Sequence, residues 1–399
     1  MNKTLFCNVA MLEGDGLSPV VGDLLIADGC IAAVGSVSAE EAADAVEFAR
    51  GEHYLLAPGY INTHTHVAMA LLRDYGGDQP LDVWLNNYIW PAEARLSDDD
   101  VYWGSCLGML EMIAGGATCF MEMYDHCDAI AQAVVDSGMR AIISRGSVGM
   151  NDPEGRGIAE NDAAYARWHG AEEDRIRIWY GPHAPNTCPG EYIQEMAAHA
   201  RQRNTGVHIH VAETKGEFDF IQGKYGMTPA AWLESLGVLD VPTLAAHSVW
   251  LTDEDIAIYA RHGVAAAHNP ISNLKLASGI CRVEDLERAG VVVGLGTDEK
   301  HRRWHMWCEK GEILRTCGMH AAVNSERWRC LLNRFGQARV ERCVANERWN
   351  IAENLEFHFG AISDCDIFHD FANAADELRA QIVVENAQRS LHDGGLRNN

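Results

Sequence analysis

Residues 58 to 66 decide the fold, and they read PGYINTHTH. An apolar strand begins directly after the Pro-Gly pair and ends in two histidines. Side chains two residues apart on a strand point to the same side, so His64 and His66 face the same space. Buried imidazoles are costly unless something binds them. Taken alone, the pattern fits a metal site and a pair of hydrogen-bonded core histidines equally well.

From this stretch onward, apolar strands alternate with amphipathic helices. Helices are expected to start at Ser97, which is followed by Asp100 three residues later, and at Thr228 and Thr252. We predict eight strands, at residues 60–66, 117–124, 139–146, 175–183, 206–214, 243–248, 264–270 and 291–298.

Eight successive steps of strand and helix favour an α/β fold, a closed (β/α)₈ barrel of TIM type over residues 58–298. An open doubly wound sheet is the alternative. Such a sheet normally carries a Gly-rich phosphate loop after its first strand, where this chain has His64-Thr65-His66.

The segments on either side of the barrel differ from it. Residues 1–57 predict a small β domain of sandwich type, with a hairpin of residues 20–26 and 30–34 around the turn Ala27-Asp28-Gly29. Residues 299–399 are atypical, because their first half is rich in Arg, Trp and Cys and has few clean periods. A reading-frame shift just after the Asp298 codon is one hypothesis for this segment. It predicts a missing eighth helix, an uncovered apolar barrel surface and poor packing.

Polar residues of matching chemistry end several of the predicted strands. His210 and Glu213 end the fifth strand, His247 ends the sixth and Asp298 ends the eighth. The carboxyl ends of barrel strands carry the active site, so these residues and the histidines of the first strand are expected at one rim. This coincidence of position and residue type favours a metal site over core histidines.

With these residues in place, the chain through Asp298 resembles the amidohydrolase superfamily. Within it, the chain is similar to the family of 5'-methylthioadenosine and S-adenosylhomocysteine deaminases and to the related triazine hydrolases. The resemblance implies a mononuclear metal centre held by His64, His66, His210 and Asp298, with Zn²⁺ as the expected ion and Fe²⁺ as the alternative. Imidazoles and a carboxylate suit Zn²⁺ chemically. The motifs that carry the resemblance are PGYINTHTH (58–66), PLDVWL (80–85), WPAE (90–93), YGPH (180–183), HVAET (210–214) and HNPISNLKLASG (268–279).

The deaminase interpretation gives three of these residues catalytic roles. A bound metal lowers the pKa of a water molecule, which attacks C6 of an adenine ring. Glu213 would protonate ring N1, Asp298 would accept the proton of the water, and His247 would orient the attacking group. Each role has a plain structural alternative: Glu213 as a helix cap, His247 bonded to a backbone carbonyl, and Asp298 as a helix N-cap. His208 is expected to pack or to support a ligand.

The resemblance also assigns the substrate-binding residues. Trp84 would form a wall for the purine, Glu93 would accept hydrogen bonds from the ribose, and His183 would touch either group. Arg145 at the end of the third strand and Arg156 in the loop 151–157 match arginines that bind the carboxylate of S-adenosylhomocysteine, for which a guanidinium fork is well shaped. Two arginines favour adenosine thioethers over triazines, which carry no anionic group.

Composition limits the class of partner. The 399 residues carry a formal net charge of -25, so a nucleic-acid surface is not expected. No signal peptide or membrane span is predicted, and the twelve cysteines form no CxxC pair, so we predict a cytoplasmic protein with free thiols. The expected partner is a small aminopurine nucleoside, and the oligomeric state, a homo-oligomer included, stays open.

Three functions remain for testing. The first is hydrolytic deamination of adenosine thioethers, the second is removal of chloride or an amine from a triazine, and the third is a metal-binding remnant without activity. Ammonia release against chloride release separates the first two. Stoichiometric metal without turnover would indicate the third.

Overall fold

The computed structural model describes residues 3–13, 18–51, 55–73, 75–76 and 79–298. These residues divide into two compact units, one ending at Pro58 and the other beginning at Gly59. The atypical segment 299–399, together with the reading-frame hypothesis attached to it, lies outside the described residues.

The N-terminal unit is a single five-stranded sheet within the part that is described. Its strands are β1 (Lys3–Glu13), β2 (Ser18–Ala27), β3 (Cys30–Gly35), β4 (Val46–Arg50) and β5 (Leu55–Leu56). Their order is β3-β2-β1-β4, with β5 beside β1, so the sandwich predicted for this unit is not seen in the described residues. The predicted hairpin is confirmed, because β2 pairs antiparallel with β3 and Ala27 faces Cys30. Asp28 and Gly29 in its turn both have positive φ, as a two-residue turn of this kind requires.

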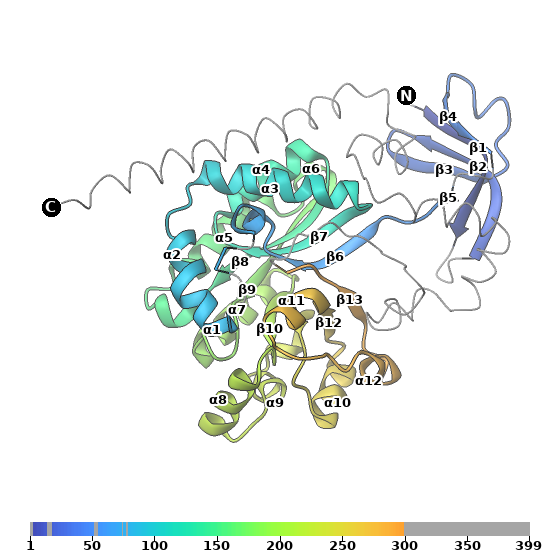
Figure 1. The fold of residues 1–399 in the computed structure, drawn as a ribbon. Coiled ribbons are helices and arrows are strands. Elements are labelled where there is room, and N and C mark those ends of the chain that lie inside the picture. Colours follow the sequence, from blue (N-terminus) through green and yellow to red (C-terminus); the bar gives the residue numbers. More distant parts are fainter. Residues whose placement is uncertain (1–2, 14–17, 52–54, 74, 77–78, 299–399) are drawn as a thin grey trace. The chain divides into compact units, whose positions relative to one another are not determined.

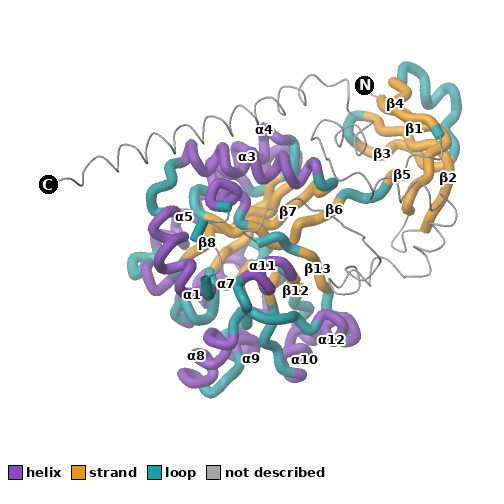
Figure 2. The backbone as a smooth tube through the Cα atoms, viewed as in Figure 1, coloured by secondary structure: helices purple, strands orange, loops and turns teal. Residues whose placement is uncertain are grey.

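The second unit confirms the predicted barrel. Eight strands follow one another in sequence order, and every neighbouring pair is parallel (Figures 1 and 2). The predicted positions differ from the observed ones only at the strand ends. The strands are β6 (Tyr60–Thr65), β7 (Ala117–Tyr124), β8 (Arg140–Ser147), β9 (Ile176–Pro182), β10 (Val207–Val211), β11 (Thr243–His247), β12 (Ala265–His268) and β13 (Val293–Leu295).

Helices connect the strands and pack around them (Figure 1). Ser97, Thr228 and Thr252 are the N-caps of α3, α9 and α10, as predicted, and the first and last of them form complete capping boxes. The helices are α1 (Leu81–Trp84), α2 (Trp90–Glu93), α3 (Asp98–Ala114), α4 (Cys127–Ser137), α5 (Arg156–Trp168), α6 (Ala171–Asp174), α7 (Gly190–Gln202), α8 (Lys215–Tyr225), α9 (Pro229–Ser235), α10 (Asp253–His262), α11 (Pro270–Lys275) and α12 (Val283–Arg288).

The capping box of α3 makes a testable contribution to stability. Because Ser97 Oγ accepts from the backbone of Asp100, we expect Ser97→Ala to lower the free energy of unfolding by about 1 kcal/mol. Urea denaturation followed by circular dichroism measures this change. Ser97→Asp retains a capping oxygen and should stay near the wild type, and equal stability of all three proteins would contradict the assignment.

The barrel closes where the chain beyond β13 meets β6. The backbone amides of Thr297 and Asp298 both donate to the carbonyl of His64, at 2.9 and 3.0 Å. Only glycine fits at position 296, since a Cβ there would lie 2.2 Å from Asn269 Oδ1 and 2.9 Å from His64 Cβ. This closure rules out the open doubly wound sheet and brings Asp298 next to the histidines of β6.

Candidate metal centre

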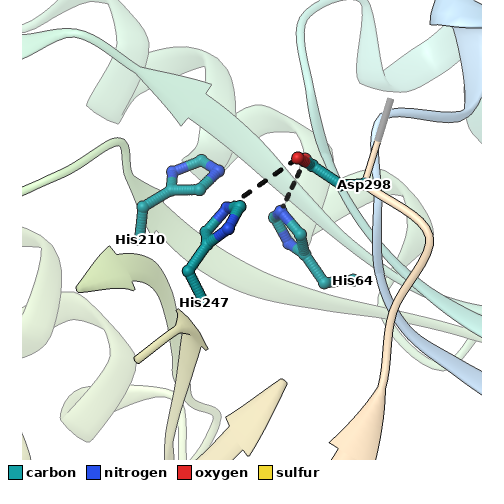
Figure 3. A group of neighbouring side chains, drawn as sticks. All are labelled: His64, His210, His247 and Asp298. Carbon is teal, nitrogen blue, oxygen red and sulfur yellow. Dashed lines mark hydrogen bonds and ion pairs between the residues drawn. The ribbon is translucent and has the colours of Figure 1, made fainter. Parts of the chain in front are cut away.

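Four side chains from distant parts of the barrel place one ligand atom each within 4.8 Å of all the others. They are His64 on β6, His210 on β10, His247 at the end of β11 and Asp298 beyond β13, and all four are buried. In Figure 3 the imidazoles of His64 and His247 are joined to the carboxylate of Asp298 by dashed lines, with His210 beside them. The arrangement forms at the rim that the sequence predicts.

His66 adjoins the same carboxylate. Its Nε2 lies 3.1 Å from Asp298 Oδ1, and the Nε2 of His64 lies 3.2 Å from the same oxygen. The Nε2 of His247 is farther away, 3.9 Å from Asp298 Oδ2 and 3.7 Å from Glu213 Oε2. The sequence predicts His66 as a ligand and His247 as a catalytic residue, whereas the group of mutually close ligand atoms contains His247 and not His66.

The three imidazoles of the cluster and the neighbouring imidazole of His66 are each held by a hydrogen bond at Nδ1. Because each Nδ1 is engaged away from the centre, Nε2 is the nitrogen left to bind an ion, and hydrogen bonds of this kind fix both ring orientation and tautomer. The Nδ1 partners are His208 Nε2 for His64 (2.8 Å), the Met123 carbonyl for His66 (2.5 Å), the His183 carbonyl for His210 (2.7 Å) and Asn273 Oδ1 for His247 (2.8 Å).

The electrostatics suit metal ligation. Burial lowers the pKa of His64 to about 4 and holds the pKa of His210 well below its usual value, so both rings are neutral and can donate a lone pair. His66 differs: burial alone would lower its pKa, but the hydrogen bond and charge of Asp298, with the charge of Glu122, raise it to about 10. A divalent cation would take over this neutralisation of Asp298. The donor set of imidazoles and one carboxylate therefore fits such an ion.

Asp298 has a fixed side chain and an unusual backbone conformation. Ser272 Oγ donates to Asp298 Oδ2 at 2.5 Å, and the backbone of Asp298 adopts a left-handed conformation with φ of 57°. A non-glycine residue in this conformation is uncommon, and such residues cluster at functional sites. Sequence reasoning missed the roles of Ser272 and Asn273, although both fall in the motif 268–279.

Glu213 lies beside the cluster and is buried. Its Oε1 accepts from Ser278 Oγ at 3.4 Å, and burial together with the negative charge of Asp298 raises its pKa to about 8. The alternative role of helix cap does not apply, because the N-cap of α8 is Thr214. The carboxyl group of Glu213 lines the cavity, and its raised pKa favours the protonated form near neutral pH.

Glu217 is a site residue that the sequence did not reveal. Its buried carboxylate accepts from the backbone amides of Ala212 and Glu213, at 2.8 and 2.9 Å. Ala212 has φ of 52°, so this turn is a strained one, and its carbonyl accepts from Val249 and Trp250 in the turn after β11. Glu217 thus fixes the backbone that presents Glu213.

A cavity of about 1410 Å³ opens above the cluster. The predicted substrate-binding residues Trp84, Glu93 and His183 all line it. The indole of Trp84 is buried and donates to the carbonyl of Tyr75 at 2.9 Å, which fixes its plane. Cavities that combine apolar walls with a few convergent polar groups are the usual sites for small ligands.

Comparison with known proteins identifies the family. A model of the amidohydrolase family matches residues 55–346. The chain belongs to the amidohydrolase family. A 5-methylthioadenosine/S-adenosylhomocysteine deaminase of Moorella thermoacetica is 46% identical over 305 residues, which cover 75% of this chain and 70% of that protein. The protein of the same name in Desulforamulus reducens is 42% identical over 301 residues, with coverages of 75% and 70%.

Solved structures agree with this membership. A zinc-bound adenosine deaminase of Xanthomonas campestris is 30% identical, with a TM-score of 0.64 over 73% of this chain and 69% of that one. A zinc complex of atrazine chlorohydrolase from Arthrobacter aurescens is 23% identical, with a TM-score of 0.67 over 74% and 72%, and supports the fold alone. Within the described part of this amidohydrolase, no helix is both long and apolar enough to cross a membrane.

Of the two arginines of the amidohydrolase cavity, Arg145 lies near the end of β8, as predicted, and Arg156 is placed differently from the prediction. Arg156 is the first residue of α5 and not part of a loop. Gly155, which adopts a left-handed conformation, is the N-cap of this helix. Both Arg145 and Arg156 line the cavity. Arg145 is already paired with Asp125 and Glu160, a contact that the sequence did not indicate.

Proposed function

We propose that this amidohydrolase is a metal-dependent deaminase of adenosine thioethers, the class that contains 5'-methylthioadenosine and S-adenosylhomocysteine. The products are the inosine analogues and ammonia. The observation that carries the proposal is the meeting of His64, His210, Asp298 and Glu213 at the base of a cavity of about 1410 Å³, which is large enough for a nucleoside. Relatives at 42–46% identity that bear the name of this activity support the choice of substrate.

His64, His66, His210 and Asp298 would hold the ion, with zinc as the proposed metal. His66 is preferred to His247 because its Nε2 is 0.8 Å nearer to Asp298, at 3.1 against 3.9 Å. When bound, the ion supplies a water molecule that is acidic enough to react at neutral pH. His247 lies between Asp298 and Glu213, where its Nε2 would contact the reacting group and stabilise developing charge.

Two carboxyl groups would move the protons. Glu213, which is protonated at neutral pH, donates a proton to ring N1 as oxygen adds to C6, so that no negative charge accumulates on the ring. Asp298 accepts the proton that the water loses and passes it to the leaving amino group. As the C6–N bond breaks, the hydroxyl on C6 becomes the carbonyl of the product and gives its proton to Glu213, which restores the protonated carboxyl group, and ammonia departs.

The part of the cavity that is lined by Trp84, Glu93 and His183 would bind the nucleoside. The buried Trp84 would form a wall for the purine, and His183, whose Nδ1 is held 2.9 Å from Thr187 Oγ1, would present its other nitrogen to purine or ribose. Glu93 would accept from the ribose hydroxyls. The cavity volume of about 1410 Å³ also leaves room for a 5'-substituent.

The direct test is ammonia release by purified, zinc-loaded protein. We expect turnover of 5'-methylthioadenosine and S-adenosylhomocysteine, slower turnover of adenosine, and no chloride release from a chlorotriazine. Metal analysis of the same sample checks for one ion per chain. Chloride release without ammonia release would replace the proposal by a triazine hydrolase, and full metal occupancy without turnover of any substrate would indicate a binding remnant.

Glu217 gives a prediction about positioning. Glutamine at 217 has one acceptor oxygen and would turn its amide donors toward a backbone N–H, so Glu217→Gln should lower kcat roughly tenfold to hundredfold. KM should change much less, because Glu217 helps to place Glu213, whereas Trp84, Glu93 and His183 are the residues proposed to contact the nucleoside. Steady-state kinetics with 5'-methylthioadenosine measures both constants.

The control for Glu217 lies on the same helix. Asp219 is exposed and pairs with Lys215, so Asp219→Asn removes a carboxylate from α8 without touching the turn. We expect wild-type kinetics from this variant. Equal kcat values for Glu217→Gln and Asp219→Asn would refute the positioning role.

A further inference from the structure

One histidine of the metal centre forms a hydrogen bond whose direction its partner does not fix. The Nδ1 atoms of His66 and His210 face backbone carbonyls, which can only accept a hydrogen bond. His64 Nδ1 instead lies 2.8 Å from Nε2 of His208, and either nitrogen of this pair could carry the proton. The pair alone therefore leaves the tautomer of His64 open.

The two tautomers of His64 have opposite consequences for metal binding. With its proton on Nδ1, the ring has a lone pair on Nε2 and can ligate an ion. With its proton on Nε2, the ring would donate to Asp298 Oδ1, which lies 3.2 Å away, and the two groups would satisfy each other without a metal. The residue that sets this tautomer therefore decides whether the site is ready for an ion.

A serine on the other side of His208 supplies the missing direction. Ser144 Oγ donates its single proton to the backbone carbonyl of Glu122, at 2.6 Å. The same oxygen lies 3.2 Å from Nδ1 of His208, so toward this nitrogen it can only accept. His208 thus carries its proton on Nδ1 and offers the lone pair of Nε2 to His64.

This deduction requires a neutral His208 ring, and the surroundings provide for it. The side chains of His64, Ser144 and His208 are fully buried. They come from β6, β8 and β10, which are alternate strands of the barrel and send side chains into the same interior. The hydrogen bonds of the His208 ring go to a histidine and a serine, and burial disfavours a charged imidazole. The ring therefore has one proton, and its position is set by the serine.

We propose that Ser144 is a positioning residue of the metal centre, which sets the ring proton of His64 through His208. The protons of this chain of hydrogen bonds point from His64 to His208, from His208 to Ser144, and from Ser144 to the carbonyl of Glu122. The result is a lone pair on His64 Nε2 that is directed at the ion. This role rests on the proposed function, in which His64 is a metal ligand, and deepens it.

Zinc affinity tests the role of the hydroxyl group independently of catalysis. Ser144→Thr and Ser144→Val have nearly the same shape and differ in the hydroxyl, so their comparison controls for added volume. We expect the zinc dissociation constant, measured by competition with a chromogenic chelator, to rise about tenfold or more in Ser144→Val and to stay within about threefold of the wild type in Ser144→Thr. Equal affinities of the two variants would overturn the proposal.

A smaller side chain covers the case in which branched residues do not fit at position 144. Ser144→Ala also removes the hydroxyl, and its zinc dissociation constant should rise by about tenfold as well. If neither branched variant folds, wild-type zinc affinity in Ser144→Ala would overturn the proposal.

A double-mutant cycle tests whether the effect passes through His208. His208→Leu removes the ring that connects Ser144 to His64, so adding Ser144→Ala to this variant should weaken zinc binding no further. A loss in the double variant that equals the sum of the two single losses would contradict the relay.

Thr205→Val is the matched control for loss of a buried hydroxyl group. Thr205 is buried, and its hydroxyl also donates to a backbone carbonyl at 2.6 Å, that of Ile178. Thr205 precedes β10, however, whereas the ligands lie toward the carboxyl ends of the strands. We expect wild-type zinc affinity from this variant. A loss as large as that in Ser144→Ala would indicate general destabilisation and overturn the specific role of Ser144.

The outcomes separate the role of Ser144 from the proposed function. Ammonia release by a wild-type enzyme whose zinc affinity does not depend on Ser144 would remove the relay and keep the deaminase. Zinc affinity that depends on Ser144, without turnover of any adenosine thioether, would keep the relay and remove the deaminase. Absence of zinc binding by the wild type would remove both.

Discussion

Replacing Asp298 by asparagine should nearly abolish deamination and sharply weaken metal binding. Asp298 is the only carboxylate in the described cluster of ligand atoms, and it contacts the Nε2 atoms of His64 and His66 at 3.2 and 3.1 Å. Asparagine keeps the shape but loses the charge and the ability to accept the proton of the water. We expect kcat/KM to fall by roughly 10³-fold or more, equivalent to about 4 kcal/mol of transition-state stabilisation.

A milder change, in a residue that contacts Asp298, provides the comparison for Asp298→Asn. Ser272→Ala removes the hydrogen bond to Asp298 Oδ2 but leaves the carboxylate, so a loss of about tenfold is expected. Zinc content by atomic absorption and ammonia release should fall in the order wild type, Ser272→Ala, Asp298→Asn. Full zinc content and undiminished activity in Asp298→Asn would exclude this residue as a ligand.

Glu213→Gln is expected to have an effect of similar size with a different signature. The variant keeps a polar side chain next to His247 but has no acidic proton to transfer, and kcat should fall by roughly 10³-fold. Metal content should stay at the wild-type level, because the ligand atoms do not include this residue. Loss of zinc together with activity would instead make Glu213 a structural support of the metal centre.

The pH dependence provides an independent check on Glu213. The donor acts in its protonated form, so wild-type kcat should decrease as pH rises through the pKa of Glu213, which burial and the charge of Asp298 raise to about 8. The residual activity of Glu213→Gln should lack this alkaline decrease. Ser278→Ala, which removes only the 3.4 Å hydrogen bond to Glu213, should keep the decrease and lose a few-fold in rate.

The sequence predicted the barrel well because its evidence is local. Alternation of apolar strands and capped helices is written in consecutive residues, and all eight strand starts were predicted to within two residues. The strand ends were less well predicted. Strand β10 stops at Val211, because Ala212 turns into a left-handed conformation, and β13 covers only residues 293–295 of the predicted 291–298.

Contacts across the rim were harder to predict, because they depend on three-dimensional closure. Asn273 supports His247 from 26 residues away, and Arg145 meets Glu160 from the following helix. No periodicity marks such pairs. The different roles predicted for His66 and His247 came from the resemblance to a family and not from the residue pattern, since both are histidines at the ends of barrel strands.

The closure at Asp298 has a consequence for how this protein matures. The carboxylate lies 234 residues after His64 in the chain, yet its oxygen stands 3.2 Å from that ring. An ion bound by both His64 and Asp298 would link the first strand of the barrel to the chain after its last strand. It could bind to both only after nearly 300 residues have left the ribosome. Capture of the metal would then be a late event in biogenesis, and chelation would loosen this seam before any other part of the wall.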